Sequence, residues 1–360
     1  MTSMPPKSLP FDKPALRRGL GGLLAAAILF LAFAPYWAGR ADLRLLMEAF
    51  GFLALAQMWN LLAGYTGLVS VGQQAFVGLG GYVFFGLAMF AGFHPLVAMP
   101  LAGVAAALIA VPTGWIAFRL QGAYFAIGTW VIAEVFRLIA AQFPALGGGS
   151  GISLPVAIAK SIGSSTASRE MSMYYVAFTI ALLATFGVWA LLRSPWGLAL
   201  TAIRDSEPAA ESLGVRTRRT KFLIYVLTAG VTGLTGAFIF LQKLRISPEA
   251  AFSVNEWTAF VIFIVVIGGI GTIEGPILGV IIFFVLRGLT ADWGTWYLIM
   301  MGAIAIVVML VDKRGVWGAL QARGMPSIFT ISRNLENKAK IAPVDTPAHA
   351  EASDTVGRGS

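Results

Sequence analysis

Residues 193–221, RSPWGLALTAIRDSEPAAESLGVRTRRTK, form a polar stretch with long apolar runs on either side. The stretch holds six basic and three acidic residues, which makes it too polar to lie in the hydrocarbon core of a membrane. Ser194-Pro195 predicts a helix start, because a capping hydroxyl followed by proline is the usual pattern there. Asp205-Ser206 predicts a second start. The apolar runs on both sides of this stretch are therefore expected to cross the membrane, with 193–221 outside it.

The second helix is expected to be short and to dock on a partner. Ala209, Ala210 and Leu213 share one face by i, i+3 and i, i+4 spacing, and Gly214 can supply a left-handed stop. A short helix with a small-residue face, held outside the bilayer, suits a groove on another protein. An ordinary charged cytoplasmic loop is the alternative interpretation.

The composition of the chain is that of a membrane protein. The chain of 360 residues is 58% hydrophobic and only 12% charged. Apolar runs recur that approach the ~20 residues a helix needs to cross the bilayer. The absence of cysteine excludes disulfides and thiolate metal sites, and no phosphate-binding loop occurs. We therefore expect an all-α polytopic membrane protein with eight to ten transmembrane helices.

Ten candidate spans can be marked, although the pair around Gly268–Gly279 could form one broken unit. They are Leu20–Trp37, Leu43–Leu62, Phe76–Phe93, Val97–Phe118, Tyr124–Phe143, Tyr174–Leu192, Phe222–Leu241, Trp257–Ile270, Pro276–Leu289 and Tyr297–Val311.

Most of the 26 Lys and Arg residues fall on one side if the N-terminus is cytoplasmic, which is the distribution that orients membrane proteins. This orientation predicts a cytoplasmic N-terminal segment (1–18) and a membrane domain (19–312). It places an external loop at 145–172 and keeps 193–221 in the cytoplasm. Residues 313–360 are expected to be a cytoplasmic, largely disordered tail, because residues from Arg323 onward are polar and lack apolar periodicity.

Polar side chains at membrane depth are candidates for a substrate pathway. The stretch GYTGLVSVGQQAFVGLGGY, residues 64–82, offers Tyr65, Ser70, Gln73 and Gln74. Close helix packing through its glycines, with the glutamines bonding between helices, is the alternative. Glu134, three residues before Arg137, is a further candidate or else one half of a structural ion pair near the external boundary.

Other motifs favour no chemistry of their own. GGIGTIEGPILG, residues 268–279, predicts a break between two apolar runs, with Glu274 favoured near the positive end of the following helix. The glycine-rich run 147–151 is either a flexible linker or a surface that adapts to a partner. His94 and His349 lie too far apart for a metal site, and no catalytic motif supports an enzyme.

The chain resembles a known family in three blocks that cover most of residues 60–290. They are GYTGLVSVGQQAFVGLGGY, then GAYFAIGTWVIAEVFRLIAAQFPALGGGSGIS, and then SPWGLALTAIRDSEPAAESLGV with VIGGIGTIEGPILG downstream. These blocks are similar to the transmembrane permease subunits of ABC importers in the branched-chain amino acid class, the LivM type.

The resemblance implies that 193–221 is the coupling loop, which sits in a cleft of the ATP-hydrolysing subunit. Ala209, Ala210 and Gly214 match the family's motif, whereas its usual glutamate position holds Pro208, with Glu207 one residue early. The residues assigned to coupling are Arg204, Asp205, Glu207, Ala209, Ala210, Leu213 and Gly214. Leu213→Glu, or a bulky residue at Ala210, is expected to uncouple ATP hydrolysis from transport without unfolding the protein.

The resemblance also implies partners and a location. The expected complex holds a sister permease, two ABC ATPase subunits and an external solute-binding protein. ATP is expected on the ATPase chains, with no cofactor on this one and no nucleic acid. The chain is expected in the lipid of the bacterial cytoplasmic (inner) membrane, as a multi-pass protein with both termini cytoplasmic. The solute would be a branched-chain or related amino acid, or alternatively urea or a short amide.

Two interpretations from other classes remain open. An ion-coupled secondary transporter would need ionisable groups near the bilayer midplane, where only Glu134 is a candidate. A purely structural scaffold would leave uptake unchanged when the chain is deleted, and it gives no reason for the Gly- and Gln-rich stretch at 64–82.

Overall fold

The computed structural model describes residues 14–290, 294, 296–312 and 314–329, with the side chains of residues 14–18 excepted. In this part of the chain the two strands have two residues each, and all other regular structure is helical. Seven helical segments there are long and apolar enough to cross a membrane. They are Arg40–Thr66, Pro95–Ala117, Ala123–Ala141, Thr166–Arg193, Thr217–Lys243, Pro248–Gly268 and Trp296–Ala322. The chain is an all-α polytopic membrane protein, as predicted.

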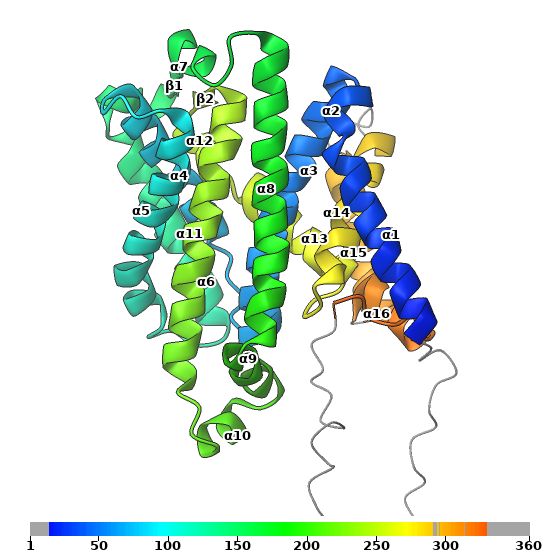
Figure 1. Cartoon of the computed structure of the whole chain (residues 1–360). Coiled ribbons are helices and arrows are strands. Elements are labelled where there is room, and N and C mark those ends of the chain that lie inside the picture. The colour runs from blue at the N-terminus through cyan, green and yellow to red at the C-terminus, as the bar shows by residue number, and fades with distance from the viewer. Residues whose placement is uncertain (1–13, 291–293, 295, 313, 330–360) are drawn as a thin grey trace, which may run out of the picture. The chain divides into compact units, whose positions relative to one another are not determined.

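Each of the ten predicted spans coincides with a helical segment of the described residues (Figure 1). The segments are α1 (Pro14–Ala32) with α2 (Ala34–Trp37), α3 (Arg40–Thr66), α4 (Gln73–Met89), α5 (Pro95–Ala117), α6 (Ala123–Ala141), α8 (Thr166–Arg193), α11 (Thr217–Lys243), η3 (Asn255–Ala259) with α13 (Phe260–Gly268), α14 (Glu274–Thr290) and α15 (Trp296–Val311). At 17 residues each, α4 and α14 are shorter than the seven long segments because each begins at a break inside the bundle.

The first predicted span is interrupted near its end, which corrects the prediction of one helix over 20–37. Pro35 has no backbone N–H, so the carbonyl of Leu31, four residues earlier, loses its helical donor. The hydroxyl of Tyr174 donates to that carbonyl at 2.6 Å. The Tyr175 hydroxyl donates to the neighbouring Ala32 carbonyl at 3.2 Å. The kink between α1 and α2 is therefore stabilised by α8.

Helix α3 is the centre of the bundle. It packs against α8, α11, α13, α14 and the short helix α9 (Pro195–Asp205). Its C-terminal half is almost wholly buried, polar residues Gln57 and Asn60 included. A polar side chain buried in a membrane domain must find a partner inside the protein. The partners of α3 are the two breaks of the chain.

The first break is residues 67–72, which join α3 to α4. Gly67 turns the chain with φ +73°, and the next five residues run back along α3 without helical structure. The Trp59 indole N–H donates to the Ser70 carbonyl at 2.9 Å, and the Gln73 amide donates to the Leu55 carbonyl at 2.9 Å. Trp59 lies seven residues before the end of α3, or roughly 10 Å at 1.5 Å per residue. Helix α4 therefore begins inside the bundle and not at its surface.

The second break is residues 269–273, between α13 and α14, where the sequence predicted one. Asn60 binds it on both sides, accepting from the Gly271 N–H at 2.8 Å and donating to the Thr272 carbonyl at 2.7 Å. Gln57 donates to the Ile273 carbonyl at 2.9 Å. Both breaks are thus held by residues 55–60 of α3, the first by Trp59 and the Leu55 carbonyl and the second by Gln57 and Asn60. Glu274 is the first residue of α14 rather than lying just before it.

Helix α11 crosses α4 and α5 at close range because small residues line the contacts. A methyl group on Gly80 would overlap the carbonyl oxygen of Gly233, and one on Gly236 would overlap that of Val77. A methyl on Gly103 would come within 2.9 Å of the Leu234 side chain. Such close backbone approach is the usual way in which helices associate in membranes.

Short elements gather at the end of the bundle that the sequence predicts to be external, namely β1, β2, α7 (Val156–Lys160) and α12 (Pro248–Ala251) (Figure 1). Strand β1 (Ile152–Ser153) pairs antiparallel with β2 (Arg245–Ile246). A methyl on Gly151 would overlap the Ile246 carbonyl, and Gly151 has φ +77°. The end of the glycine run 147–151 is therefore held by a close backbone contact with β2. Helix α8 begins at Thr166, within the predicted external loop 145–172.

The folded bundle continues beyond the predicted boundary at residue 312. Helix α16 (Gly315–Ala322) packs on α13 and α14, and Trp317 is buried. The Glu274 carboxylate then accepts the backbone N–H groups of Ile328 at 2.8 Å and Phe329 at 2.9 Å. Phe329 is buried against Phe186 and Trp189 of α8. The predictions for residues 1–13 and 330–360 lie outside the described residues.

Candidate functional site

The polar stretch 193–221 forms two short helices, as its capping residues predict. Ser194 caps α9 by accepting from the Trp196 N–H at 3.2 Å, and Pro195 is its first residue. Ser206 likewise caps α10 (Glu207–Ser212) through the Ala209 N–H at 3.4 Å. Gly214 ends the turn with φ +85°. Figure 1 shows α9 and α10 together at the end where α8 finishes.

The predicted face of α10 is wrong in one residue. Ala209 and Leu213 are exposed, with Leu213 81% exposed, but Ala210 is only 1% exposed. Ala210 faces the protein because α10 is a single short helix that packs back on α9 and α11. A bulky residue at Ala210 would therefore disturb packing within this chain. Leu213 is the apolar side chain that this helix presents to the outside.

The acids of the stretch hold it in place. Glu207 forms an ion pair with Lys221 of α11 at 2.6 Å, and Glu211 accepts from the Thr217 hydroxyl at 2.5 Å. Asp205 pairs with its neighbour Arg204 at 3.2 Å on an exposed surface. The first two contacts brace α10 against the start of α11.

Tyr65 connects this stretch to the centre of the bundle, which the sequence did not indicate. The Arg204 guanidinium lies 5.9 Å from the centroid of the Tyr65 ring, within the range of a cation–π contact. Tyr65 is fully buried in the last turn of α3. Two residues predicted for different roles, coupling and pathway, are therefore neighbours.

The other predicted pathway residues of 64–82 lie buried at the first break. Beyond the Gln73 bond to α3, the Gln74 carbonyl oxygen accepts from the Thr258 hydroxyl of η3. The Ser70 hydroxyl accepts from the Gly72 N–H at 3.2 Å. These bonds are those expected from the packing alternative. A substrate-contacting role for Ser70, Gln73 and Gln74 stays a prediction.

Glu134 does not contact the other residues predicted for the pathway. It accepts from Arg137 at 2.5 Å on α6, and both side chains are partly exposed. This is the geometry of the structural ion pair that was the alternative interpretation.

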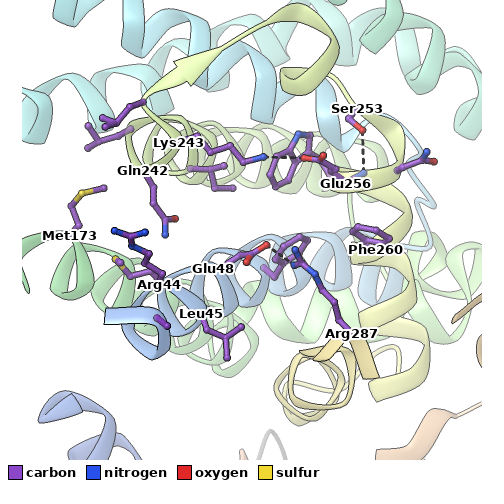
Figure 2. Close-up of a pocket in the computed structure, with 18 of the residues that line it drawn as sticks. Arg44, Leu45, Glu48, Met173, Gln242, Lys243, Ser253, Glu256, Phe260 and Arg287 are labelled. Atoms are coloured by element: carbon purple, nitrogen blue, oxygen red, sulfur yellow. Dashed lines mark hydrogen bonds and ion pairs between the residues drawn. The ribbon is translucent and has the colours of Figure 1, made fainter. Parts of the chain in front are cut away.

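A cavity of about 870 Å³, which no sequence motif predicted, opens at the end of the bundle that is expected to be external. Its walls come from the N-terminal ends of α3, α8 and α15 and the C-terminal ends of α11 and α14, together with η3. Figure 2 shows Gln242 near Arg44 and Glu48 directed toward Arg287, with Lys243 and Glu256 facing each other on the opposite wall. We call it the external cavity. The only sequence signal for this cavity is that its charged residues lie at the ends of apolar runs.

Three ion pairs line the external cavity. Arg287 pairs with Glu48 at 2.6 Å, Lys243 with Glu256 at 3.1 Å, and Arg44 with Glu170 at 3.1 Å. Each pair joins two different elements of the chain. In the described residues no group of three or more His, Cys, Asp or Glu could hold a metal ion.

Comparison with known proteins gives one family and several relatives. The model of a family described as branched-chain amino acid transport system / permease component matches residues 43–311. The high-affinity branched-chain amino acid transport system permease protein LivM of Escherichia coli is 29% identical over 82% of this chain and 74% of its own length. A probable LivM of Methanocaldococcus jannaschii is 24% identical over 72% of this chain and 80% of its own.

More distant similarity extends to sugar permeases, and no solved structure matches. The ribose import permease protein RbsC of Bacillus subtilis is 28% identical over 37% of this chain and 44% of its own length.

Proposed function

From the premise that this chain belongs to the branched-chain amino acid transport permease family, we propose that it is the membrane-spanning subunit of an ABC importer for branched-chain or related amino acids. Separate ATPase subunits drive it and hold the ATP. A sister permease completes the pathway, and an external solute-binding protein delivers the solute. The complex lies in the bacterial inner membrane with both termini of this chain in the cytoplasm.

The geometry of α10 is the observation that carries this proposal. A large apolar side chain, Leu213, is 81% exposed at the tip of the molecule, on a helix braced by the Glu207–Lys221 pair. Burial of an exposed leucine side chain lowers the free energy, so Leu213 favours contact with an apolar cleft of a partner. The Arg204–Tyr65 contact links the same helices to α3. A partner that moves α10 can therefore move the central helix.

The amino acid solute is supported by the relatives. The LivM proteins match this chain over most of its length, whereas the ribose permease matches about a third of it.

Co-purification of the ATPase subunits tests the proposal. The permease complex is purified with wild-type chain, with Leu213→Glu and with Leu213→Met. A buried carboxylate without a partner is costly, so Leu213→Glu is expected to lower the retained ATPase by about tenfold or more. Leu213→Met keeps an apolar side chain of similar volume and is expected to retain it.

The outcome is judged on well-folded protein. Size-exclusion profiles of all three chains should match, because Leu213 contacts little of its own chain. If wild type retains no ATPase, or if Leu213→Glu retains as much as wild type and drives normal uptake of leucine, the proposed coupling role of α10 is wrong.

A further inference from the structure

The external cavity carries charges of both signs on facing walls. Its lining includes four basic side chains, Arg44, Arg169, Lys243 and Arg287, and three acidic ones, Glu48, Glu170 and Glu256. The Glu48–Arg287 pair belongs to α3 and α14, and the Lys243–Glu256 pair to α11 and η3 (Figure 2). Both acids of these two pairs are less than half exposed. Partial burial strengthens their attraction for a cation that enters the cavity.

Arg169 and Gln242 are two of the polar side chains of the lining that have no hydrogen bond or ion pair in the part of the chain that the structure describes. Arg169 is the one basic side chain of the cavity outside its ion pairs, since Arg44, Lys243 and Arg287 each have an acid. Gln242 makes no side-chain hydrogen bond there, although its amide points into the cavity between Arg44 and Glu48 (Figure 2). A guanidinium and an amide that lack partners can donate to a carboxylate.

The apolar part of the lining includes three aromatic rings that pack together, those of Phe52, Trp257 and Phe260. Trp257 and Phe52 stack with ring centroids 6.0 Å apart, and Phe260 lies 6.5 Å from Phe52. Trp257 is fixed by its indole N–H, which donates to the Ala250 carbonyl at 2.7 Å. These rings form an apolar surface directly beside the charged groups.

The backbone around the cavity is irregular at two places. Residues 255–259 form a π-helical turn, which carries both Glu256 and Trp257. Leu244 has φ +55°, and no other non-glycine residue of the described chain has a positive φ. Both features cost conformational energy, and both are found preferentially at functional sites.

We propose that the external cavity is a binding site for a zwitterionic α-amino acid on its way into the permease. The ammonium group lies toward Glu48 and Glu256, the carboxylate toward Arg169 and the Gln242 amide, and an aliphatic side chain against Phe52, Trp257 and Phe260. This proposal rests on the proposed function and adds that residues of this chain themselves recognise the amino acid. The volume suits a small solute, since ligand sites commonly enclose about 300–1,000 Å³.

A direct test compares three probes on the wild-type permease–ATPase complex in lipid nanodiscs, without solute-binding protein. Leucine carries both charges, 4-methylpentanoate lacks the amino group, and leucinamide lacks the carboxylate. Binding is followed by saturation-transfer NMR. Each charge makes at least one charge-assisted hydrogen bond, so leucine is expected to bind about tenfold more tightly than either analogue.

Equal binding of the three probes overturns the proposal. So does the absence of leucine binding together with a phospholipid that stays bound to the complex in native mass spectrometry, because the cavity then holds a lipid headgroup.

Variants test the same site by transport. The double variant Glu48→Gln/Glu256→Gln keeps the size of both side chains and removes both negative charges. Leucine uptake into proteoliposomes is expected to fall about tenfold or more, while ATPase stimulation by the loaded solute-binding protein stays within about twofold of wild type. Glu249→Gln is the matched control, because Glu249 is exposed on α12 at the same end and does not line the cavity.

Failure of this site differs from failure of the proposed function. A wild-type complex without ATP-dependent leucine uptake refutes the importer itself. A wild-type complex that imports leucine, with equal uptake by the double variant and equal binding of the three probes, refutes only the amino acid site. If the double variant is misfolded, the three probes on wild-type protein decide.

Discussion

At the scale of single residues, Asn60 shows why a polar side chain is buried in the middle of an apolar helix. Both ends of its amide are used, one by the Gly271 N–H and the other by the Thr272 carbonyl. Without Asn60 these backbone groups of the second break would lie unsatisfied inside a membrane domain. Burial of an unpaired backbone group costs about 1–3 kcal/mol. Asn60 therefore stabilises a segment of backbone that lies more than 200 positions away in the sequence.

Replacing Asn60 with leucine is expected to destabilise the protein although it adds apolar surface. The side chains are similar in size, but the N–H of Gly271 and the carbonyl of Thr272 lose their partner, which should cost about 2–4 kcal/mol in total. Thermal unfolding in detergent measures the effect. Gln142→Leu, at an exposed amide after α6, is the control and should leave the unfolding temperature nearly unchanged. An equal shift in both variants would contradict this role of Asn60.

Leu213 belongs to the same scale, because one exposed side chain carries the proposed contact with the ATPase. Ala210, three residues earlier, faces the protein instead, and the packing of α10 on α9 and α11 decides that direction. Helical spacing alone grouped the two together.

At the scale of elements, the close crossing of α11 with α4 depends on glycine. Helices in a membrane gain little from burying apolar surface, because lipid is apolar too, and they associate where backbones can approach closely. The Gly80–Gly233 contact and the Gly236–Val77 contact allow this approach along nearly a whole turn.

Gly236→Ala is therefore expected to destabilise the α4–α11 crossing. The new methyl would overlap the Val77 carbonyl oxygen, so one helix must shift, at a cost of about 1–3 kcal/mol. The matched control is Gly86→Ala in α4, where a methyl meets no atom within 4 Å. Alanine favours helix by up to about 1 kcal/mol over glycine, so Gly86→Ala should be neutral or stabilising. Unfolding temperatures of both variants in one detergent decide, and a stable Gly236→Ala protein would refute the close crossing.

At the scale of the whole molecule, the arrangement of the helices predicts a transmembrane orientation. The short helices α9, α10 and α16 lie at one end, and α7, β1, β2 and α12 at the other (Figure 1). The first end carries most of the basic residues of the polar stretch 193–221. By the positive-inside tendency this end is expected in the cytoplasm.

Because the chain contains no cysteine, single cysteines report this orientation without background. Ala167→Cys, exposed at the start of α8, and Ala322→Cys, exposed at the end of α16, are matched substitutions at opposite ends. A membrane-impermeant maleimide added to spheroplasts is expected to label Ala167→Cys at once and Ala322→Cys only after permeabilisation. The reverse pattern would show that the predicted orientation is wrong.

The sequence by itself determined the class of the protein and the local course of the chain. Ten apolar runs coincide with helical segments, and Ser194, Ser206 and Gly214 mark the ends of α9 and α10, because helix length and capping depend on neighbours within a few residues. The three sequence blocks also identified the family correctly. Whether the predicted coupling and pathway residues act as proposed depends on experiments.

Only the tertiary structure decided which residues meet. Asn60 joins the break at 269–273, Arg204 reaches Tyr65, and Glu274 binds the chain at 328–329. The external cavity assembles residues from Ala41 to Leu298 that share no motif. Periodicity shows which face of a helix is apolar, but in a membrane domain nearly every face is apolar, so it does not show which face meets protein. That choice depends on how the helices pack, and packing depends on residues far apart in the sequence.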